Sequence, residues 1–177
     1  VNGAGAAGIA ITELILDLHL GNVILCDSKG IVMEGNPRNN AVKEEIAHRT
    51  NPIHQSGTLK EAIHNADVFV GVSQANMVTP EMVRSMDRDP IIFAMANPVP
   101  EIMPDVAKEA GAVVVGTGRS DFPNQVNNVL VFPGFFKGLL RVGATKVTQE
   151  MKIRAAEALA SVITDEELNA DYVLPGA

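Results

Sequence analysis

Apolar positions along this chain repeat with two periods, one typical of helices and one typical of buried strands. Ile11, Leu14 and Leu18 lie at helical spacing and form one apolar face. Short runs of branched apolar residues separate such helical stretches, and these runs predict strands that are buried on both faces. The expected strands are residues 23–26, 67–73, 91–94 and 112–115.

Capping and breaking residues indicate where the helices begin and end. Thr58 and Glu61 have the spacing of a capping box, and Pro80 follows Thr79 at a first helical position. Gly21 is expected to end the first helix. The expected helices are the first one, with Ile11 to Leu18 on its apolar face, then residues 39–49 and 59–65, one that opens at Pro80, one from Pro104 to Gly111, and a helical region from about Asn124. The last region carries an apolar stripe formed by Val147, Met151, Ala155, Leu159 and Val162.

The alternation of these strands and helices defines the fold class. Helices of this length between strands imply right-handed crossovers and parallel pairing. We therefore predict an α/β fold, a doubly wound Rossmann-type parallel sheet with helices on both faces. Residues 1–163 are expected to form this domain, and residues 164–177 a C-terminal tail.

Composition and charge exclude several classes of protein. The 177 residues suit one domain, and 46% of them are hydrophobic, although tryptophan is absent. A net charge of −7 argues against a nucleic-acid partner. No apolar run approaches the roughly 18 residues of a membrane span, so we expect no membrane partner. The single cysteine, Cys26, cannot form an internal disulfide, which favours a reducing, cytoplasmic location.

The glycine-rich stretch at the start of the chain carries the first candidate chemistry. In the pattern GxGxxG, the first glycine permits the tight turn, the second lets a pyrophosphate approach, and the third allows close packing of helix and sheet. The N-terminus of the following helix then offers free N–H groups to the phosphates. The candidate cofactor-binding residues of this loop are Gly3, Ala4, Gly5, Ala6, Ala7 and Gly8.

The acidic residue at the end of the second expected strand bears on the choice of cofactor. Asp27 stands where a carboxylate accepts hydrogen bonds from the adenosine ribose and repels a 2′-phosphate, which favours NAD. Ser28 and Lys29 follow it, and Lys29 would favour NADP if its loop turned the side chain inward. A surface lysine is the commoner role. An ordinary glycine turn with a solvated aspartate is the alternative to a nucleotide site.

Six longer motifs carry a family resemblance. They are VNGAGAAG, DSKG, GVS, FAMANPVPEI, GTGRSDFPNQVNNVL and FPGFFKG. Together they resemble the cofactor-binding domain of malic enzyme in its shorter bacterial form, from Val1 to about Ile163. The resemblance implies oxidative decarboxylation of L-malate to pyruvate and CO2, with NAD or NADP as the hydride acceptor. It also implies a divalent Mg2+ or Mn2+ ion in the complete enzyme.

Further site residues follow from the same resemblance. It implies that Asn97, and either Asn127 or Asn128, line the malate and nicotinamide site. Asn97 follows an expected strand, at the edge where open α/β sheets bind ligands, and an amide can donate to a carboxylate. The alternatives are a turn residue before proline for Asn97 and helix-start hydrogen bonds for the other two. Val72 and Ser73 are expected near the nicotinamide ribose, although the segment after GVS departs from the family pattern.

The residues that catalyse the reaction in this family are missing from the chain. The tyrosine acid, the lysine base and three metal-binding carboxylates lie upstream of the glycine loop in the family, whereas the one tyrosine here is Tyr172. We therefore expect no catalytic residue and no metal ligand in this chain, a preceding catalytic domain as a partner, and a homo-oligomer, namely a dimer. Another dehydrogenase domain, or a non-catalytic dinucleotide-binding module, are the alternatives.

Overall fold

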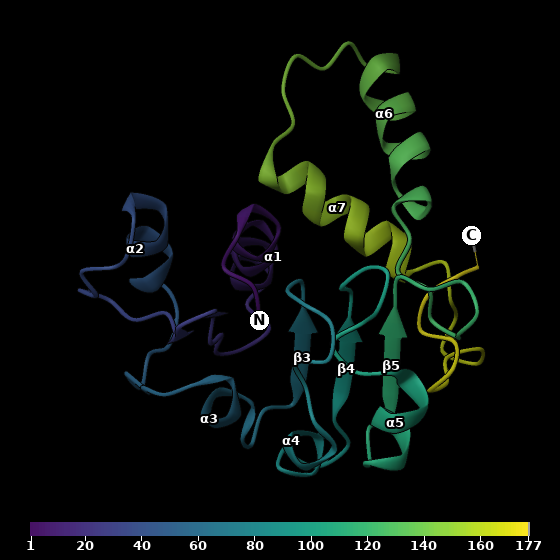
Figure 1. Ribbon diagram of the computed structural model, residues 1–177. Coiled ribbons are helices and arrows are strands. Elements are labelled where there is room, and N and C mark those ends of the chain that lie inside the picture. Colours follow the sequence, from purple (N-terminus) through teal and green to yellow (C-terminus); the bar gives the residue numbers. More distant parts are fainter. Residues whose placement is uncertain (177) are drawn as a thin grey trace.

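A parallel sheet of three strands lies at the centre of the computed structural model, which describes residues 1–176 (Figure 1). The strands are β3 (Val68–Gly71), β4 (Ile91–Ala94) and β5 (Val114–Thr117). They pair in the order β3-β4-β5, with Val68 opposite Ile91 and Ile91 opposite Val114. The expected parallel α/β arrangement is thereby confirmed.

Two segments near the start of the chain continue the sheet beyond β3. Asn2 forms parallel bridges with Gly71 on one side and with Cys26 on the other. The segments therefore lie in the order Cys26, Asn2, β3, β4, β5, and the direction of winding reverses between Asn2 and β3. Open α/β sheets bind ligands at such a reversal, outside the carboxyl ends of the strands.

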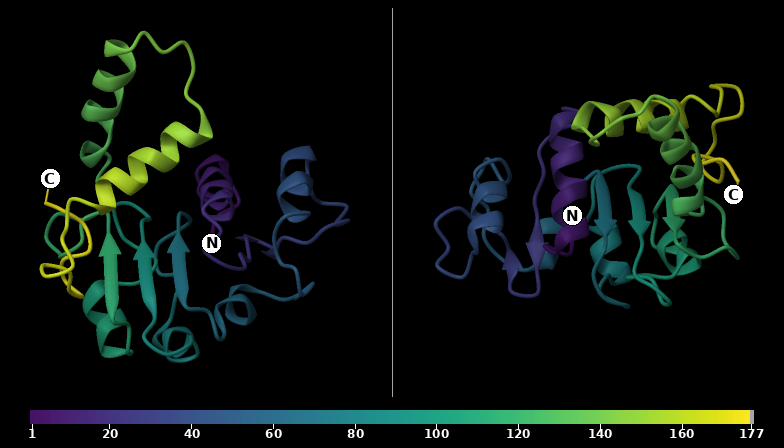
Figure 2. Two further views of the ribbon diagram at one scale, coloured as in Figure 1. Left: turned by 180° about the vertical axis from the view of Figure 1, so that it is seen from behind. Right: turned by 90° about the horizontal axis from the view of Figure 1, so that it is seen from above.

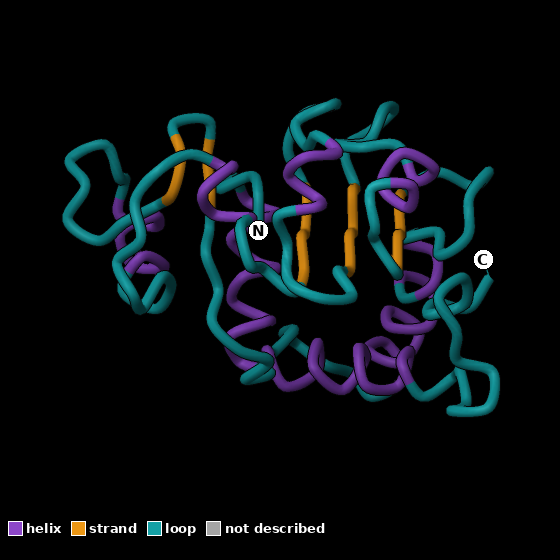
Figure 3. Tube along the Cα trace, turned by 90° about the horizontal axis from the view of Figure 1, so that it is seen from below, coloured by secondary structure: helices purple, strands orange, loops and turns teal. Residues whose placement is uncertain are grey.

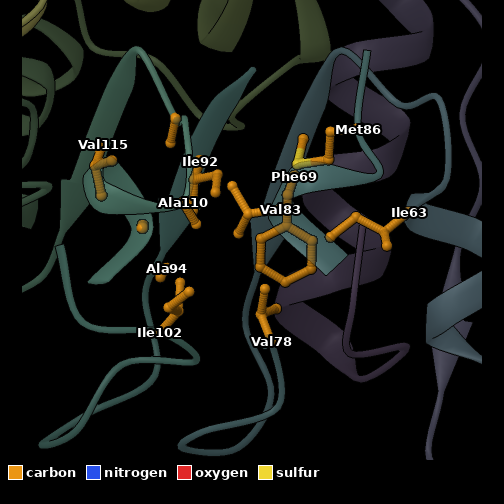
Figure 4. Close-up of a cluster of buried hydrophobic side chains, with 12 residues drawn as sticks. Ile63, Phe69, Val78, Val83, Met86, Ile92, Ala94, Ile102, Ala110 and Val115 are labelled. Carbon is orange, nitrogen blue, oxygen red and sulfur yellow. The ribbon is translucent and has the colours of Figure 1, made fainter. Parts of the chain in front are cut away.

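Helices cover the sheet on two sides. Figures 2 and 3 show α3 (Leu59–Ile63), α4 (Pro80–Arg84) and α5 (Pro104–Glu109) on one side, and α1 (Ala6–Asp17) and α7 (Gln149–Ala160) on the other. The first side holds the main core, in which side chains of α3, α4 and α5 pack on alternate residues of the strands. Figure 4 shows ten of its residues by name: Ile63, Phe69, Val78, Val83, Met86, Ile92, Ala94, Ile102, Ala110 and Val115.

The remaining elements lie at the margins of this sandwich. A hairpin of β1 (Cys26–Asp27) and β2 (Gly30–Ile31) was not expected, and α2 (Ala41–Ala47) packs beside α1 through a second, smaller core. A 3-10 turn, η1 (Asn128–Leu130), leads into α6 (Phe132–Arg141). Figure 1 shows α6 rising away from the sheet, beyond the carboxyl ends of the strands.

The capping signals predicted the starts of two helices correctly, whereas the end of the first helix and the bounds of two strands were predicted at the wrong residues. The capping box of Thr58 and Glu61 and the cap of Thr79 before Pro80 are confirmed. The expectation that Gly21 ends the first helix is wrong, because α1 ends at Asp17 and His19 takes the left-handed conformation with φ 53°. Two strands are shifted as well.

The strand expected at residues 23–26 is Cys26–Asp27, because the hairpin pairs Cys26 with Ile31. The strand expected at 112–115 is Val114–Thr117, because the amide of Ala112 still donates to the carbonyl of Ala107 and so belongs to the end of α5. Within residues 1–176, no helix combines the length and the apolar character needed to cross a membrane.

Candidate functional site

The glycines of the first loop differ in what surrounds them. A Cβ atom on Gly3, whose φ is +117°, would lie 2.5 Å from the carbonyl oxygen of Val72, and one on Gly8 would lie 1.7 Å from that of Gly3. The chain's own packing therefore requires both glycines. Gly5 has an extended backbone, and a Cβ there would have no neighbour within 4 Å. Its surroundings are open, as a site that admits a ligand to the backbone requires.

The N-terminus of α1 is left free beside this opening. The helix begins at Ala6, its N-cap residue Gly5 has no side chain to cap it, and its first turn has no acidic residue. Ala4 is half-buried and packs against the smaller core, whereas Ala6 and Ala7 are exposed. The first N–H groups of a 12-residue helix thus face open space, which is an arrangement that binds anions such as phosphate.

Three loops meet at the carboxyl edge of the sheet. The side-chain amide of Asn2, which precedes the glycine loop, donates to Oγ of Ser73 over 2.8 Å. Ser73 follows β3, and both its amide and its hydroxyl donate to Oε1 of Glu101. The other oxygen of Glu101 accepts from the amide of Ala96, next to the exposed Asn97. The structure therefore brings together the glycine loop, the Val72–Ser73 segment and the Asn97 loop.

Asp27 is held by two hydrogen bonds. Its Oδ2 accepts from Nζ of Lys43 over 2.5 Å, and its Oδ1 accepts from the amide of Lys29. Burial by itself would raise the pKa of Asp27, but the hydrogen bonds from Lys43 and Lys29 outweigh it and leave that pKa below its usual range. The side chains of Ser28 and Lys29 are exposed. Lys43, not Lys29, is thus the cation that contacts this carboxylate.

The two asparagines after β5 have different surroundings. Oδ1 of Asn127 accepts from the amide of Val129 over 3.1 Å and so caps η1. Asn128 is exposed, and within residues 1–176 no hydrogen bond is formed by its side chain. Neither side chain is hydrogen-bonded to the Ser73 or Asn97 loops in the described part of the chain. The helix-start role is therefore present at Asn127.

Sequence reasoning missed two residues of this site, Lys43 and Glu101. Lys43 lies on the first turn of α2, and its position gives no local sign that it reaches Asp27. Glu101 ends the motif ANPVPE, and its complete burial would have been hard to predict for a carboxylate. The neighbouring Cys26 is not a candidate nucleophile, because burial raises the pKa of its thiol to about 11.

An apolar groove lies apart from these loops, between α6 and α7. It has a volume of about 950 Å³ and is lined by side chains that include Phe135, Leu139, Met151, Ala155 and Leu159. The described residues contain no group of three or more histidine, cysteine, aspartate or glutamate side chains that could hold a metal ion. The three loops that meet at the carboxyl edge of the sheet are therefore the strongest candidate site in the described part of the chain.

Comparison with known proteins determines the family. The family model of the malic enzyme NAD binding domain matches residues 1–177. This chain belongs to that family. The resemblance drawn from the six motifs and the Rossmann-type fold are thereby confirmed.

Individual malic enzymes match this domain closely. The bifunctional malic/malolactic enzyme of Bacillus subtilis is 61% identical over 175 residues, which is 98% of this chain and 43% of that protein. The NAD-dependent malic enzyme of Geobacillus stearothermophilus is 47% identical over 175 residues, 99% of this chain and 36% of that protein. Other matched relatives are named NADP-dependent malic enzymes.

A solved structure agrees with the fold. The crystal structure of the NAD-dependent malic enzyme from Thermotoga maritima has a TM-score of 0.93 and 47% sequence identity, over 99% of this chain and 46% of that chain. The chain thus spans less than half the length of the relatives named here.

Proposed function

We propose that this chain is the cofactor-binding part of a malate oxidoreductase (decarboxylating), which converts L-malate and NAD(P)+ to pyruvate, CO2 and NAD(P)H. One observation carries the proposal: the space over Gly5 is open, and it adjoins the uncapped N-terminus of α1 at the reversal of the sheet. That combination suits a dinucleotide pyrophosphate. The names of the matched relatives supply the substrate, malate.

Each loop has a distinct role in this proposal. The amides of the Gly3–Gly8 loop and of α1 bind the pyrophosphate, and Asp27 accepts from the adenosine ribose. Val72 and Ser73 then lie beside the nicotinamide half. A bound nicotinamide would supply the acceptor for the hydride that leaves C2 of malate. The exposed amide of Asn97 orients the substrate carboxylate without adding a competing charge.

Between the two asparagines after β5, we propose Asn128 as the substrate residue. The side-chain oxygen of Asn127 is already occupied by the amide of Val129, whereas Asn128 is exposed. In the enzyme that contains this domain, Asn97→Ala and Asn128→Ala should each lower kcat/KM for malate. The expected decrease corresponds to a loss of about 2 to 4 kcal/mol in transition-state stabilisation. Unchanged kcat/KM in both variants would contradict the assignment.

NAD is the proposed cofactor, with NADP as the alternative. The contact of Lys43 with Asp27 limits the expected preference for NAD over NADP. A carboxylate whose charge is partly neutralised by a lysine repels a 2′-phosphate less strongly. Lys43→Met should therefore weaken NADP relative to NAD by about tenfold, since it removes the cation while keeping Asp27. The ratio of kcat/KM for the two cofactors measures this, and an unchanged ratio would remove Lys43 from the specificity site.

The proposed Mg2+ or Mn2+ ion rests on the family alone. The described residues do not fit such an ion, because they contain no cluster of three acidic, histidine or cysteine side chains. We therefore assign its ligands, like the catalytic acid and base, to a domain outside this chain. We also propose a homodimer, and the apolar groove between α6 and α7 supports contact with another protein surface.

The domain limits and the cellular location complete the proposal. Residues 1–163 form the NAD(P)-binding domain and residues 164–177 a tail. The side-chain amide of Asn124 attaches the tail to the sheet, because it donates to the carbonyls of Val115 and Ala170. A cytoplasmic location is proposed on the single, buried Cys26.

Titration of NAD into the 177-residue chain tests the cofactor site. Gly5→Val places a branched side chain in the open space and should weaken NAD by at least about tenfold, because the pyrophosphate can no longer reach the backbone. Gly138→Val in α6 is the matched control, since a Cβ there also has no neighbour within 4 Å. Equal affinities in the two variants would contradict the proposed site.

A further inference from the structure

Glu101 is a completely buried carboxylate that holds two loops together. Its exposed fraction is 0%, and none of the ion pairs formed within residues 1–176 includes it. Oε1 accepts from the amide of Ser73 over 2.8 Å and from its hydroxyl over 3.1 Å. Oε2 accepts from the amide of Ala96 over 2.9 Å. One side chain thus connects the loop after β3 to the loop after β4.

The neighbours of Glu101 all require it to be an acceptor. The side-chain amide of Asn2 donates to Oγ of Ser73, so the hydroxyl proton of Ser73 is free to point at Glu101. The other two partners are backbone N–H groups, which only donate. A carboxylate satisfies donors on both oxygens, whereas a glutamine must turn its NH2 group toward one of them and leave that N–H buried without a partner.

The position of the carboxylate is fixed by the strand beneath it. A Cβ atom on Gly71, the last residue of β3, would lie 2.4 Å from Cδ of Glu101 and 2.6 Å from its Oε1. Backbone bonds add to this contact, because the amide of Val78 donates to the carbonyl of Glu101. The glycine of the motif GVS thus makes room for the glutamate of ANPVPE.

The two connected loops lie on one side of the proposed dinucleotide site. Asp27 marks the adenosine side of the reversal between Asn2 and β3, so the nicotinamide half extends toward the carboxyl ends of β3 and β4. We infer that Glu101 is a positioning residue, which holds Ser73 and Asn97 in the relative placement that the nicotinamide half and the substrate require. This inference deepens the proposed function and rests on it.

Binding of NAD and of ADP-ribose to the 177-residue chain separates positioning from a purely structural role. ADP-ribose retains the adenosine and pyrophosphate but lacks the nicotinamide. Glu101→Gln should therefore weaken NAD by about tenfold and leave ADP-ribose nearly unchanged, which lowers the ratio of their affinities. Glu109→Gln, an exposed site on α5, makes the same change of charge and should keep the wild-type ratio.

Gly71→Ala provides a second variant, because it displaces the carboxylate without altering its chemistry. It should lower the ratio in the same direction, which keeps the test open if Glu101→Gln does not fold. The inference would be overturned if the wild-type chain bound NAD and ADP-ribose equally well. It would also be overturned if neither variant changed the ratio of NAD affinity to ADP-ribose affinity, whether because binding was unaffected or because both molecules were weakened equally. Failure of the wild-type chain to bind either molecule would instead overturn the proposed function, and the inference with it.

Discussion

Two groups of helices in this chain differ in how much apolar surface they bury. Helices α3, α4 and α5 pack on β3–β5, where Ile92 and Ala94 have exposed fractions of 0%. Helices α6 and α7 contain no buried residue, and Leu140 is 82% exposed. Both groups nevertheless show apolar residues at helical spacing. Apolar periodicity therefore predicts a helix, but it does not reveal whether its apolar face packs on the same chain or on another surface.

Core truncation should produce the largest difference between the two regions. Ile92→Ala removes a fully buried side chain from the core between the sheet and helices α3, α4 and α5, and should lower the free energy of unfolding by about 2 to 5 kcal/mol. Leu140→Ala on α6 should change it by less than about 0.5 kcal/mol. Urea unfolding of both variants measures this, and similar losses would mean that α6 packs on the body of the domain.

This contrast also explains what could be predicted from the sequence. The capping box of Thr58 and Glu61 was found because both partners lie within one turn. The contact of Lys43 with Asp27 spans 16 residues, and that of Glu101 with Ser73 spans 28. Which loops meet depends on the order of the strands, and local patterns do not contain that order. The glycine loop could thus be found in the sequence, whereas the contacts of Lys43 and Glu101 could not.

Two glycines of the first loop differ in the same way, because Gly8 packs closely on its own chain and Gly5 does not. A Cβ on Gly8 would meet the backbone oxygen of Gly3 at 1.7 Å, so Gly8→Ala should cost about 1 to 3 kcal/mol of unfolding free energy through forced backbone shifts. Gly5→Ala meets nothing within 4 Å and should change stability by less than about 0.5 kcal/mol. Thermal unfolding compares them, and equal destabilisation would show that Gly5 also packs on its own chain.

The pair of asparagines before α6 should show a smaller difference of the same kind. Asn127→Ala removes the acceptor for the amide of Val129 and should cost about 1 kcal/mol, as loss of a helix cap does. Asn128→Ala removes an exposed amide and should leave the free energy of unfolding unchanged within about 0.5 kcal/mol. A greater loss for Asn128→Ala in urea unfolding would reverse the assignment of the two residues.

The smallest effect concerns Asp17, a polar link between α7 and the body of the domain. Its Oδ2 accepts from the side chain of Gln149 at the start of α7, and its Oδ1 accepts from Arg49. The hydrogen bonds from Gln149 and Arg49, and the nearby His19, lower the pKa of Asp17. Because the folded-state pKa lies below the unfolded value of about 3.9, this link contributes above that value and is lost as the pH falls through the folded-state pKa.

Hydrogen-exchange protection, corrected for the intrinsic pH dependence of exchange, measures that loss. The amides of α7 should lose protection relative to those of α5 as the pH falls from about 5 to about 3, because a protonated Asp17 holds Gln149 and Arg49 less strongly. In Asp17→Asn the difference between α7 and α5 should already be present at the higher pH and should not change with acid. The same pH profile in the variant and the wild type would show that Asp17 does not control the attachment of α7. The apolar contacts of α7 would then be what holds this helix in place.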